Sequence, residues 1–313
     1  MSNDSEEKYL TLADGRTLAY ADAGDPSSSV VVIFLHGVFG TGSAPLSLSP
    51  ALVEKNAHQI VPTLAGWGYS SPRPSSQNYA DTLTSDMTEL ITHLHPNTAD
   101  LDIYVSGGSY GSVPAQMLYG APFDKFPLGR HIRGCLILAP FSPFKWHKGY
   151  TKSMTWANYI SVGPPYARVP VPASSAHHHI RVVYADEHGG QSGRHAAQVY
   201  VRGSAGGARG VCAIARGAGH RGGGVGASDG ERHGQEHLED LDKDHTSGRP
   251  ILIAASTNDE LGPDMASWLK ENYANSRLKW VPGKHVSTLY EVDNLWAELL
   301  AMANESASSP AAL

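Results

Sequence analysis

Apolar residues gather in short runs along most of the chain, and these runs predict the strands of a sheet. Each run is bounded by polar or turn-forming residues, which is typical of buried strands. The clearest runs cover residues 31–35, 101–105, 250–255 and 278–281. Residues 9–22 alternate around Asp14 and Gly15 in the manner of a β-hairpin.

Two other segments repeat their apolar residues at helical spacing. Residues 79–95 carry Leu83, Met87, Leu90, Ile91 and Leu94, and the C-terminal segment carries Leu289, Val292, Leu295, Trp296, Leu299 and Leu300. We interpret both sets as helix faces that pack on a core. Because strands and helices mostly alternate outside the middle of the chain, we expect an α/β fold with a mostly parallel sheet and helices on both faces.

The segment Gly107-Gly108-Ser109-Tyr110-Gly111 follows the predicted strand 101–105 and opens into a helix-like stretch. This G-x-S-x-G pattern has chemical meaning in that setting, because it holds the serine on a sharp turn between a strand and a helix. Small residues are needed beside the serine, since a side chain there would collide with neighbouring backbone. The N–H groups at the start of the helix would face developing negative charge. Ser109 is therefore the candidate nucleophile.

A serine hydroxyl is a weak nucleophile at neutral pH, so it needs a general base and an acid that orients the base. Asp259 follows the predicted strand 250–255, and His285 follows the predicted strand 278–281. Both lie just past the C-terminal ends of strands, where α/β sheets place their sites, and the order serine, acid, histidine suits this scaffold. Glu260 is the alternative acid. Asp259 as a capping or turn carboxylate, and His285 as a solvent-facing loop histidine, are the competing interpretations.

The apolar run 31–35 ends in His36-Gly37, and this segment resembles the oxyanion-hole loop of the α/β-hydrolase family. The resemblance implies that the backbone amides of Val38 and Tyr110 would bind the oxyanion. A preorganised donor of this kind contributes roughly 3–4 kcal/mol to transition-state stabilisation. His36 itself is expected to tie the loop down rather than to transfer protons.

Together with the serine motif, these residues make the chain similar to a single-domain serine α/β-hydrolase of the lipase or esterase kind, over residues 8–160 and 240–303. The resemblance implies a three-layer α/β-hydrolase fold with an eight-stranded, mostly parallel sheet, an N-terminal antiparallel hairpin and an inserted cap. Residues 1–140 and 241–313 would form the core, and residues 141–240 the cap region. Residues 61–70 resemble the family's glycine-rich loop, but Thr63 stands where an acidic residue is common, which puts the bracing of that loop in question.

Composition limits the classes of function. With 313 residues the chain can bury one large core, or a core with a cap, and its formal charge of −6 argues against nucleic acid as a partner. No run approaches the roughly 18 apolar residues of a membrane span, and the acidic start lacks a signal-peptide pattern. The two cysteines, Cys135 and Cys212, predict no disulfide framework, and Cys135 lies in an apolar run as an inert core thiol would. We expect a cytoplasmic enzyme that acts on a small-molecule substrate without a cofactor or a metal.

The composition changes between residues 171 and 235. No leucine occurs between Leu138 and Leu238 and no lysine between Lys152 and Lys243, while arginine, glycine, alanine and histidine are abundant. Such a segment cannot bury enough apolar surface to offset its ordering entropy, so we expect it to have no fixed structure. A natural disordered insertion, a histidine-rich metal site and translation in a shifted reading frame all remain open. If the cap is missing, the site would be wet and its electrostatic interactions weaker.

The leading hypothesis is a cofactor-independent hydrolase of carboxylic esters or related acyl substrates, acting through a Ser109, Asp259 and His285 triad and a covalent acyl-enzyme. One alternative is a proline-iminopeptidase-like amide hydrolase, which the Gly-Gly-Ser-Tyr-Gly motif also resembles. Another is a non-catalytic protein of the same fold that binds a ligand or a partner. The altered cap segment favours that second alternative, and the retained triad argues against it.

Overall fold

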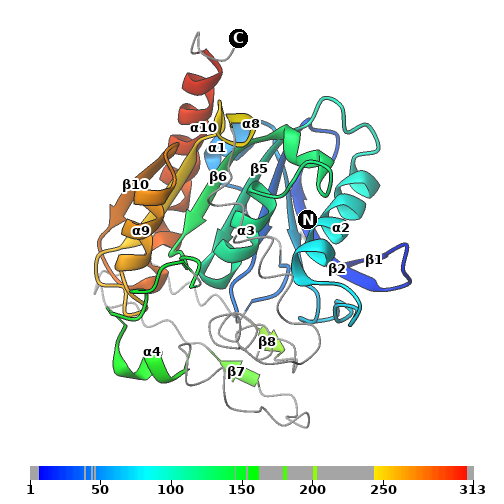
Figure 1. Cartoon of the computed structure of the whole chain (residues 1–313). Helices are drawn as coiled ribbons and strands as arrows, with labels where there is room; N and C mark the ends of the chain where they lie inside the picture. The colour runs from blue at the N-terminus through cyan, green and yellow to red at the C-terminus, as the bar shows by residue number, and fades with distance from the viewer. Residues whose placement is uncertain are drawn as a thin grey trace, which may run out of the picture.

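Eight strands form one twisted sheet at the centre of the molecule (Figure 1). The computed structural model describes residues 7–161 except 39, 44, 46, 145 and 153, together with residues 179–181, 200–202 and 243–308. The strands are β1 (Lys8–Thr11), β2 (Thr17–Gly24), β3 (Val30–Leu35), β4 (His58–Pro62), β5 (Asp102–Gly108), β6 (Ile132–Leu138), β9 (Ile251–Ser256) and β10 (Ser276–Val281). Their order across the sheet is β1-β2-β4-β3-β5-β6-β9-β10. Strand β2 is antiparallel to both of its neighbours and the other pairs are parallel, which confirms the predicted sheet and its N-terminal hairpin.

Helices cover both faces of the sheet, as predicted. Helices α2 (Tyr79–Leu94), α3 (Ser112–Tyr119) and α9 (Asp264–Asn272) pack on one face, and α1 (Pro50–Glu54) and α10 (Val292–Ser308) on the other (Figure 1). The shorter elements are α4 (Trp156–Ser161), α8 (Lys243–Thr246) and the 3₁₀ helices η1 (Ser109–Gly111), η2 (Pro127–His131) and η3 (His285–Glu291). No helix within the described ranges is both long enough and apolar enough to span a membrane.

Most of the periodic residues of the two predicted helices are buried, Leu94 and Val292 are partly buried, and Leu289 is exposed. In α2 the buried positions include Leu83, Met87, Leu90 and Ile91, and Asn78 caps the helix by accepting from the Asp81 amide at 2.7 Å. The C-terminal prediction is wrong for Leu289, which lies in η3 before α10 begins and is 47% exposed. η3 is a 3₁₀ helix with about three residues per turn, so the 3.6-residue spacing of α10 does not extend back to Leu289.

The predicted core thiol is fully buried. Cys135 lies in β6, between two parallel neighbours, and is free. Burial raises the pKa of its thiol to about 12. Since the thiolate is the reactive form, Cys135 is chemically inert, as expected from the sequence.

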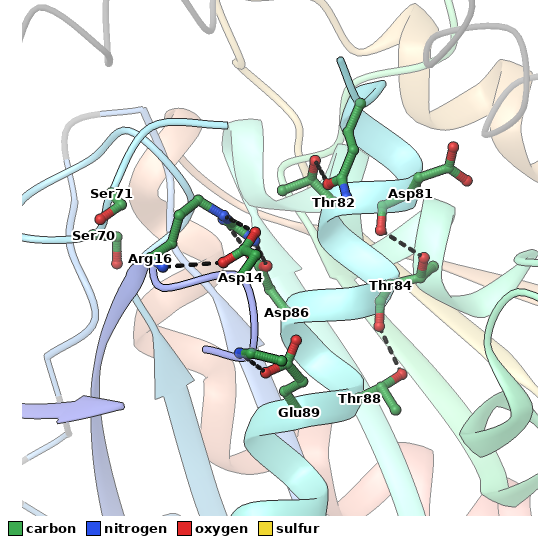
Figure 2. A network of polar contacts seen from close by, with 12 residues as sticks. Asp14, Arg16, Ser70, Ser71, Asp81, Thr82, Thr84, Asp86, Thr88 and Glu89 are labelled. Carbon is green, nitrogen blue, oxygen red and sulfur yellow. Dashed lines mark hydrogen bonds and ion pairs between the residues drawn. The ribbon is translucent and has the colours of Figure 1, made fainter. Parts of the chain in front are cut away.

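A polar network attaches the N-terminal hairpin to α2 (Figure 2). Arg16, just before β2, forms an ion pair with Asp86 on α2 and donates to Asp14 at 2.7 Å through Nε. The Ala13 amide donates to Glu89 on the same helix at 2.7 Å. The hairpin is therefore held against α2 by charged groups in addition to its pairing with β4.

Little of the compositionally unusual segment falls within the described residues. Between residues 171 and 235 they comprise β7 (His179–Arg181) and β8 (Tyr200–Arg202), which pair antiparallel in a separate two-stranded sheet that the sequence did not predict. The lack of fixed structure was expected for all of residues 171–235, and apart from these two strands that segment lies outside the described residues. The start of the predicted cap region packs on the core, because Phe141, Phe144 and Tyr150 form a buried cluster with Met265 of α9.

Candidate active site

Ser109 stands on a strained turn at the C-terminal end of β5. Its φ of 53° lies in the left-handed region, which non-glycine residues rarely occupy. A Cβ on Gly107 would collide with the backbone of Gly111, and one on Gly111 would collide with the Leu35 carbonyl group. Gly108 has no such restriction, since a Cβ there would come only within 3.8 Å of Leu138. The two outer glycines of the motif thus allow the close backbone packing that the turn requires.

The structure brings Ser109, His285 and Asp259 into one hydrogen-bonded chain. Ser109 Oγ and His285 Nε2 are 2.9 Å apart, and His285 Nδ1 and Asp259 Oδ2 are 2.8 Å apart. Because a carboxylate can only accept, Nδ1 carries the proton that it donates to Asp259, which leaves Nε2 free to accept from the serine hydroxyl. Asp259 is buried, whereas the His285 side chain is one quarter exposed.

Backbone hydrogen bonds beyond the ends of β9 and β10 place the aspartate and the histidine side by side. The Thr257 amide donates to the Val281 carbonyl and the Asn258 amide donates to the Gly283 carbonyl, each at 3.0 Å. Gly283 has a φ of 117°, and a Cβ there would collide with the Ser287 side chain. A glycine is therefore required where the chain turns to present His285.

The neighbouring acid does not share the position of Asp259. Asp259 Oδ1 also accepts from the Leu261 amide at 2.9 Å, which fixes the orientation of the carboxylate. Glu260 is exposed, and its carbonyl accepts from the Thr155 amide at 3.2 Å and from Asn158 Nδ2 at 3.0 Å. The side chain of Glu260 therefore lies outside the chain of hydrogen bonds, while its backbone attaches the start of α4.

The turn after β3 lies against Ser109. A Cβ on Gly37 would lie 3.6 Å from Ser109 Cβ and 3.4 Å from the Gly108 carbonyl oxygen. Val38 follows directly, and its carbonyl accepts from Trp67 Nε1 at 3.2 Å. Tyr110 is the first residue after Ser109 and its ring is buried. The two residues predicted to supply oxyanion amides therefore flank the serine on neighbouring segments.

His36 occupies a purely structural position. Its Nδ1 donates to the Gly37 carbonyl at 2.8 Å, and its Nε2 accepts from the Leu64 amide at 3.0 Å. Burial lowers the pKa of His36 to about 4, so the imidazole stays neutral at physiological pH. With both nitrogens engaged and no charge, His36 ties the turn to the loop after β4, as the sequence indicated.

Thr63 braces its loop although it carries no acidic group. It is fully buried, and its Oγ1 accepts from the Gly42 amide at 2.8 Å. Ser70 closes the other end of the loop, because its Oγ donates to the Thr63 carbonyl at 2.7 Å and accepts from the Ala19 amide at 2.9 Å. The hydroxyls of Thr63 and Ser70 thus brace this loop without a charged group.

Sequence reasoning missed two residues close to the serine. Ser112 Oγ donates to the Ser109 carbonyl at 2.5 Å and accepts from the Phe141 amide at 2.9 Å. Trp67, 5% exposed, stacks on Tyr110 with ring centroids 5.3 Å apart. The only sequence signal for Trp67 was a large aromatic residue between Gly66 and Gly68.

Among the residues that the structure describes, no group of three or more histidine, cysteine, aspartate or glutamate side chains could hold a metal ion.

Comparison with known proteins identifies the fold. No protein-family model matches the chain, and neither does any curated protein. Among solved structures, a hydrolase from Pseudomonas aeruginosa is 17% identical, with a TM-score of 0.55 and coverage of 96% of this chain and 99% of that one. A thioesterase domain from the curacin biosynthetic pathway is 15% identical (TM-score 0.54, coverage 98% and 100%). A thermophilic esterase from Thermogutta terrifontis is 19% identical (TM-score 0.52, coverage 95% and 99%). The chain has the α/β-hydrolase fold.

Proposed function

We propose that the protein is a serine-dependent hydrolase of carboxylic esters that works through a covalent acyl-enzyme. The observation that carries the proposal is the pair of hydrogen bonds from Ser109 to His285 and from His285 to Asp259, at 2.9 and 2.8 Å. A strained serine at a strand end, hydrogen-bonded to an imidazole that a buried carboxylate orients, is an arrangement suited to nucleophilic catalysis.

In the first half of the reaction Ser109 Oγ attacks the ester carbonyl carbon while His285 Nε2 takes the hydroxyl proton. Asp259 keeps the imidazole in the tautomer that can accept at Nε2 and stabilises the imidazolium that forms. The tetrahedral intermediate then loses the alcohol, which leaves with the proton from His285. In the second half, His285 Nε2 takes a proton from water as the water oxygen attacks the acyl-enzyme carbonyl carbon. The tetrahedral intermediate then releases the carboxylic acid, while His285 returns that proton to Ser109 Oγ.

The developing oxyanion would bind to the backbone amides of Val38 and Tyr110. The contact of Gly37 with Ser109 supports this assignment, because it brings the turn after β3 next to the reacting group. Such donors act without reorganisation, and losing one of them costs roughly 10² to 10³ in kcat.

The proposed substrates are small acyl compounds. Solved structures of the same fold include esterases, a lipase and a thioesterase domain, which supports acyl transfer as the reaction class. No cofactor is required by the proposed steps, since every proton and electron pair moves between Ser109, His285, the substrate and water.

Labelling with a fluorophosphonate probe tests the proposal. The wild-type protein should be labelled and should hydrolyse p-nitrophenyl acetate, and Ser109→Ala should do neither. Ser106→Ala is the matched control, because it removes a buried hydroxyl for which the described residues provide no hydrogen-bond partner. Labelling that persists in Ser109→Ala would contradict the nucleophile assignment. A wild-type protein that is folded but unlabelled would instead favour the non-catalytic, ligand-binding alternative.

A further inference from the structure

Trp67 contacts both segments that would supply the oxyanion amides. It lies in the loop between β4 and α2 and is 5% exposed. Its indole Nε1 donates to the Val38 carbonyl at 3.2 Å. Its ring stacks on the Tyr110 ring, with centroids 5.3 Å apart and planes 23° apart. One rigid side chain therefore bridges the turn after β3 and the turn after β5.

The sheet itself does not set the spacing between these two turns. The paired register of β3 and β5 ends at Leu35 and Gly107, so Val38 and Tyr110 both lie beyond the last paired residues. Tyr110 leaves the sheet in η1, and Val38 lies within a turn that the Gly40 amide closes by donating to the Gly37 carbonyl. Close packing of Gly37 on Ser109 and of Gly111 on Leu35 brings the two turns together, and side-chain contacts beyond that packing act on the distance between the two amides.

Trp67 is itself held in place by independent contacts. Its amide donates to the Leu64 carbonyl at 2.9 Å, and the Leu64 amide in turn donates to His36 Nε2. The His36 and Trp67 rings meet edge to face at 5.9 Å. The Tyr110 hydroxyl donates to the hydroxyl of partly buried Tyr79 at 3.3 Å. The indole of Trp67 is thus held in place between the Val38 carbonyl and the Tyr110 ring.

We propose that Trp67 is a positioning residue that sets the separation of the Val38 and Tyr110 amides, an inference that rests on the proposed hydrolase function. Oxyanion donors must lie about 2.7–3.1 Å from the oxygen that becomes charged, and displacements of 1 Å can cost about 10²-fold in rate. Trp67 acts through its contacts with the Val38 carbonyl and the Tyr110 ring, which hold the segments that carry the two amides.

Two substitutions separate its two contacts. Trp67→Phe keeps an aromatic ring against Tyr110 and removes the donor to the Val38 carbonyl, whereas Trp67→Leu removes both. For p-nitrophenyl acetate we expect kcat to fall about 10-fold in Trp67→Phe and about 100-fold in Trp67→Leu, with KM nearly unchanged. Equal losses in kcat and kcat/KM mark an interaction that is made only in the transition state. Affinity for a trifluoromethyl ketone, which forms an oxyanion on the serine, should fall by the same factors.

Trp296→Phe is the matched control for loss of a buried indole. Trp296 lies on α10, is 2% exposed, and packs against the face of the sheet opposite to the one that α2, α3 and α9 cover. This control should lower the melting temperature and leave kcat and the ketone affinity of the folded protein unchanged.

The outcomes distinguish this inference from the proposed function. If the wild type is active and both Trp67 variants keep its kcat and ketone affinity, the positioning role is wrong and the proposed function stands. If Trp67→Leu lowers only the melting temperature, its role is structural and the inference is again overturned. If the wild type shows neither hydrolysis nor fluorophosphonate labelling, both the proposed function and the inference fall.

Discussion

His285 Nε2 lies 2.9 Å from Ser109 Oγ, although 176 residues separate the two in the chain. Ser109 follows β5 and His285 follows β10, and β6 and β9 lie between those strands. Three strand spacings amount to about 14 Å, so the segments beyond the strands must bring the side chains together. The bonds from Thr257 and Asn258 to the turn after β10 place His285 beside Asp259 and so contribute to this approach.

The identity of the acid can be tested by two neighbouring substitutions. Asp259→Asn should lower kcat about 10⁴-fold, because an amide holds the imidazole in the wrong tautomer. Glu260→Gln should keep nearly full activity, since its exposed side chain lies outside the hydrogen-bonded chain. Steady-state kinetics on p-nitrophenyl acetate decide between them. A larger loss of kcat in the Glu260→Gln variant would contradict the assignment of Asp259 as the acid.

The glycines around the serine should differ in their tolerance of alanine. Gly111→Ala would push a methyl group into the Leu35 carbonyl, so we expect a loss of stability of about 1–3 kcal/mol and a displaced serine with low activity. Gly108→Ala meets only an ordinary contact with Leu138 and should change stability by less than about 0.5 kcal/mol. Urea unfolding and fluorophosphonate labelling rates provide the comparison. Equal behaviour of the two variants would show that close packing does not maintain the turn.

The ion pair between Arg16 and Asp86 should matter far more than an exposed pair of the same chemistry. Burial raises the pKa of Asp86, and Arg16→Met would leave that carboxylate without its guanidinium. We expect a loss of about 3 kcal/mol in the free energy of unfolding, part of which Asp86→Asn should restore in the double variant. Arg133→Met breaks an exposed pair with Asp102 and should cost less than about 1 kcal/mol. Chemical denaturation of the four proteins tests this difference, and equal losses in the two single variants would contradict it.

A buried histidine pair should make the fold sensitive to acid. His58 Nδ1 and His95 Nε2 are 2.8 Å apart and join the start of β4 to the end of α2. Burial lowers the pKa of both, although Asp22, 3.6 Å from His58 and itself paired with Lys8, opposes the shift at His58. The unfolded chain then binds protons more readily than the folded one. The contribution of the pair is therefore fully present above about pH 6.5 and is lost as the pH falls towards the lowered folded-state pKa.

The substitution His95→Gln should reduce this pH dependence. We expect its free energy of unfolding to fall less than that of the wild type between about pH 7.5 and pH 5, because one of the coupled groups no longer titrates. His93→Gln removes an exposed histidine of the same helix and serves as the control with an unchanged slope. Urea denaturation across this pH range measures the slopes. Identical slopes in His95→Gln and the wild type would rule out the pair as a source of acid sensitivity.

The sequence by itself determined the class of the fold, the hairpin, the main strands and the strand ends at which Ser109, Asp259 and His285 lie. Those features are local: a run of apolar residues reports burial, and a glycine or an aspartate after it reports where the strand ends. The same locality explains the error at Leu289, since spacing cannot tell whether a helix has already docked on the sheet.

Only the tertiary structure decided which residues meet. The pairing of Arg16 with Asp86, the contact of His58 with His95 and the placement of Trp67 between Val38 and Tyr110 each join segments far apart in the chain. A polar or aromatic residue needs a partner when it is buried, but the sequence does not say which residue that partner is. For Trp67 that choice follows from the strand order and the register, which bring the C-terminal ends of β3, β4 and β5 together at one edge of the sheet.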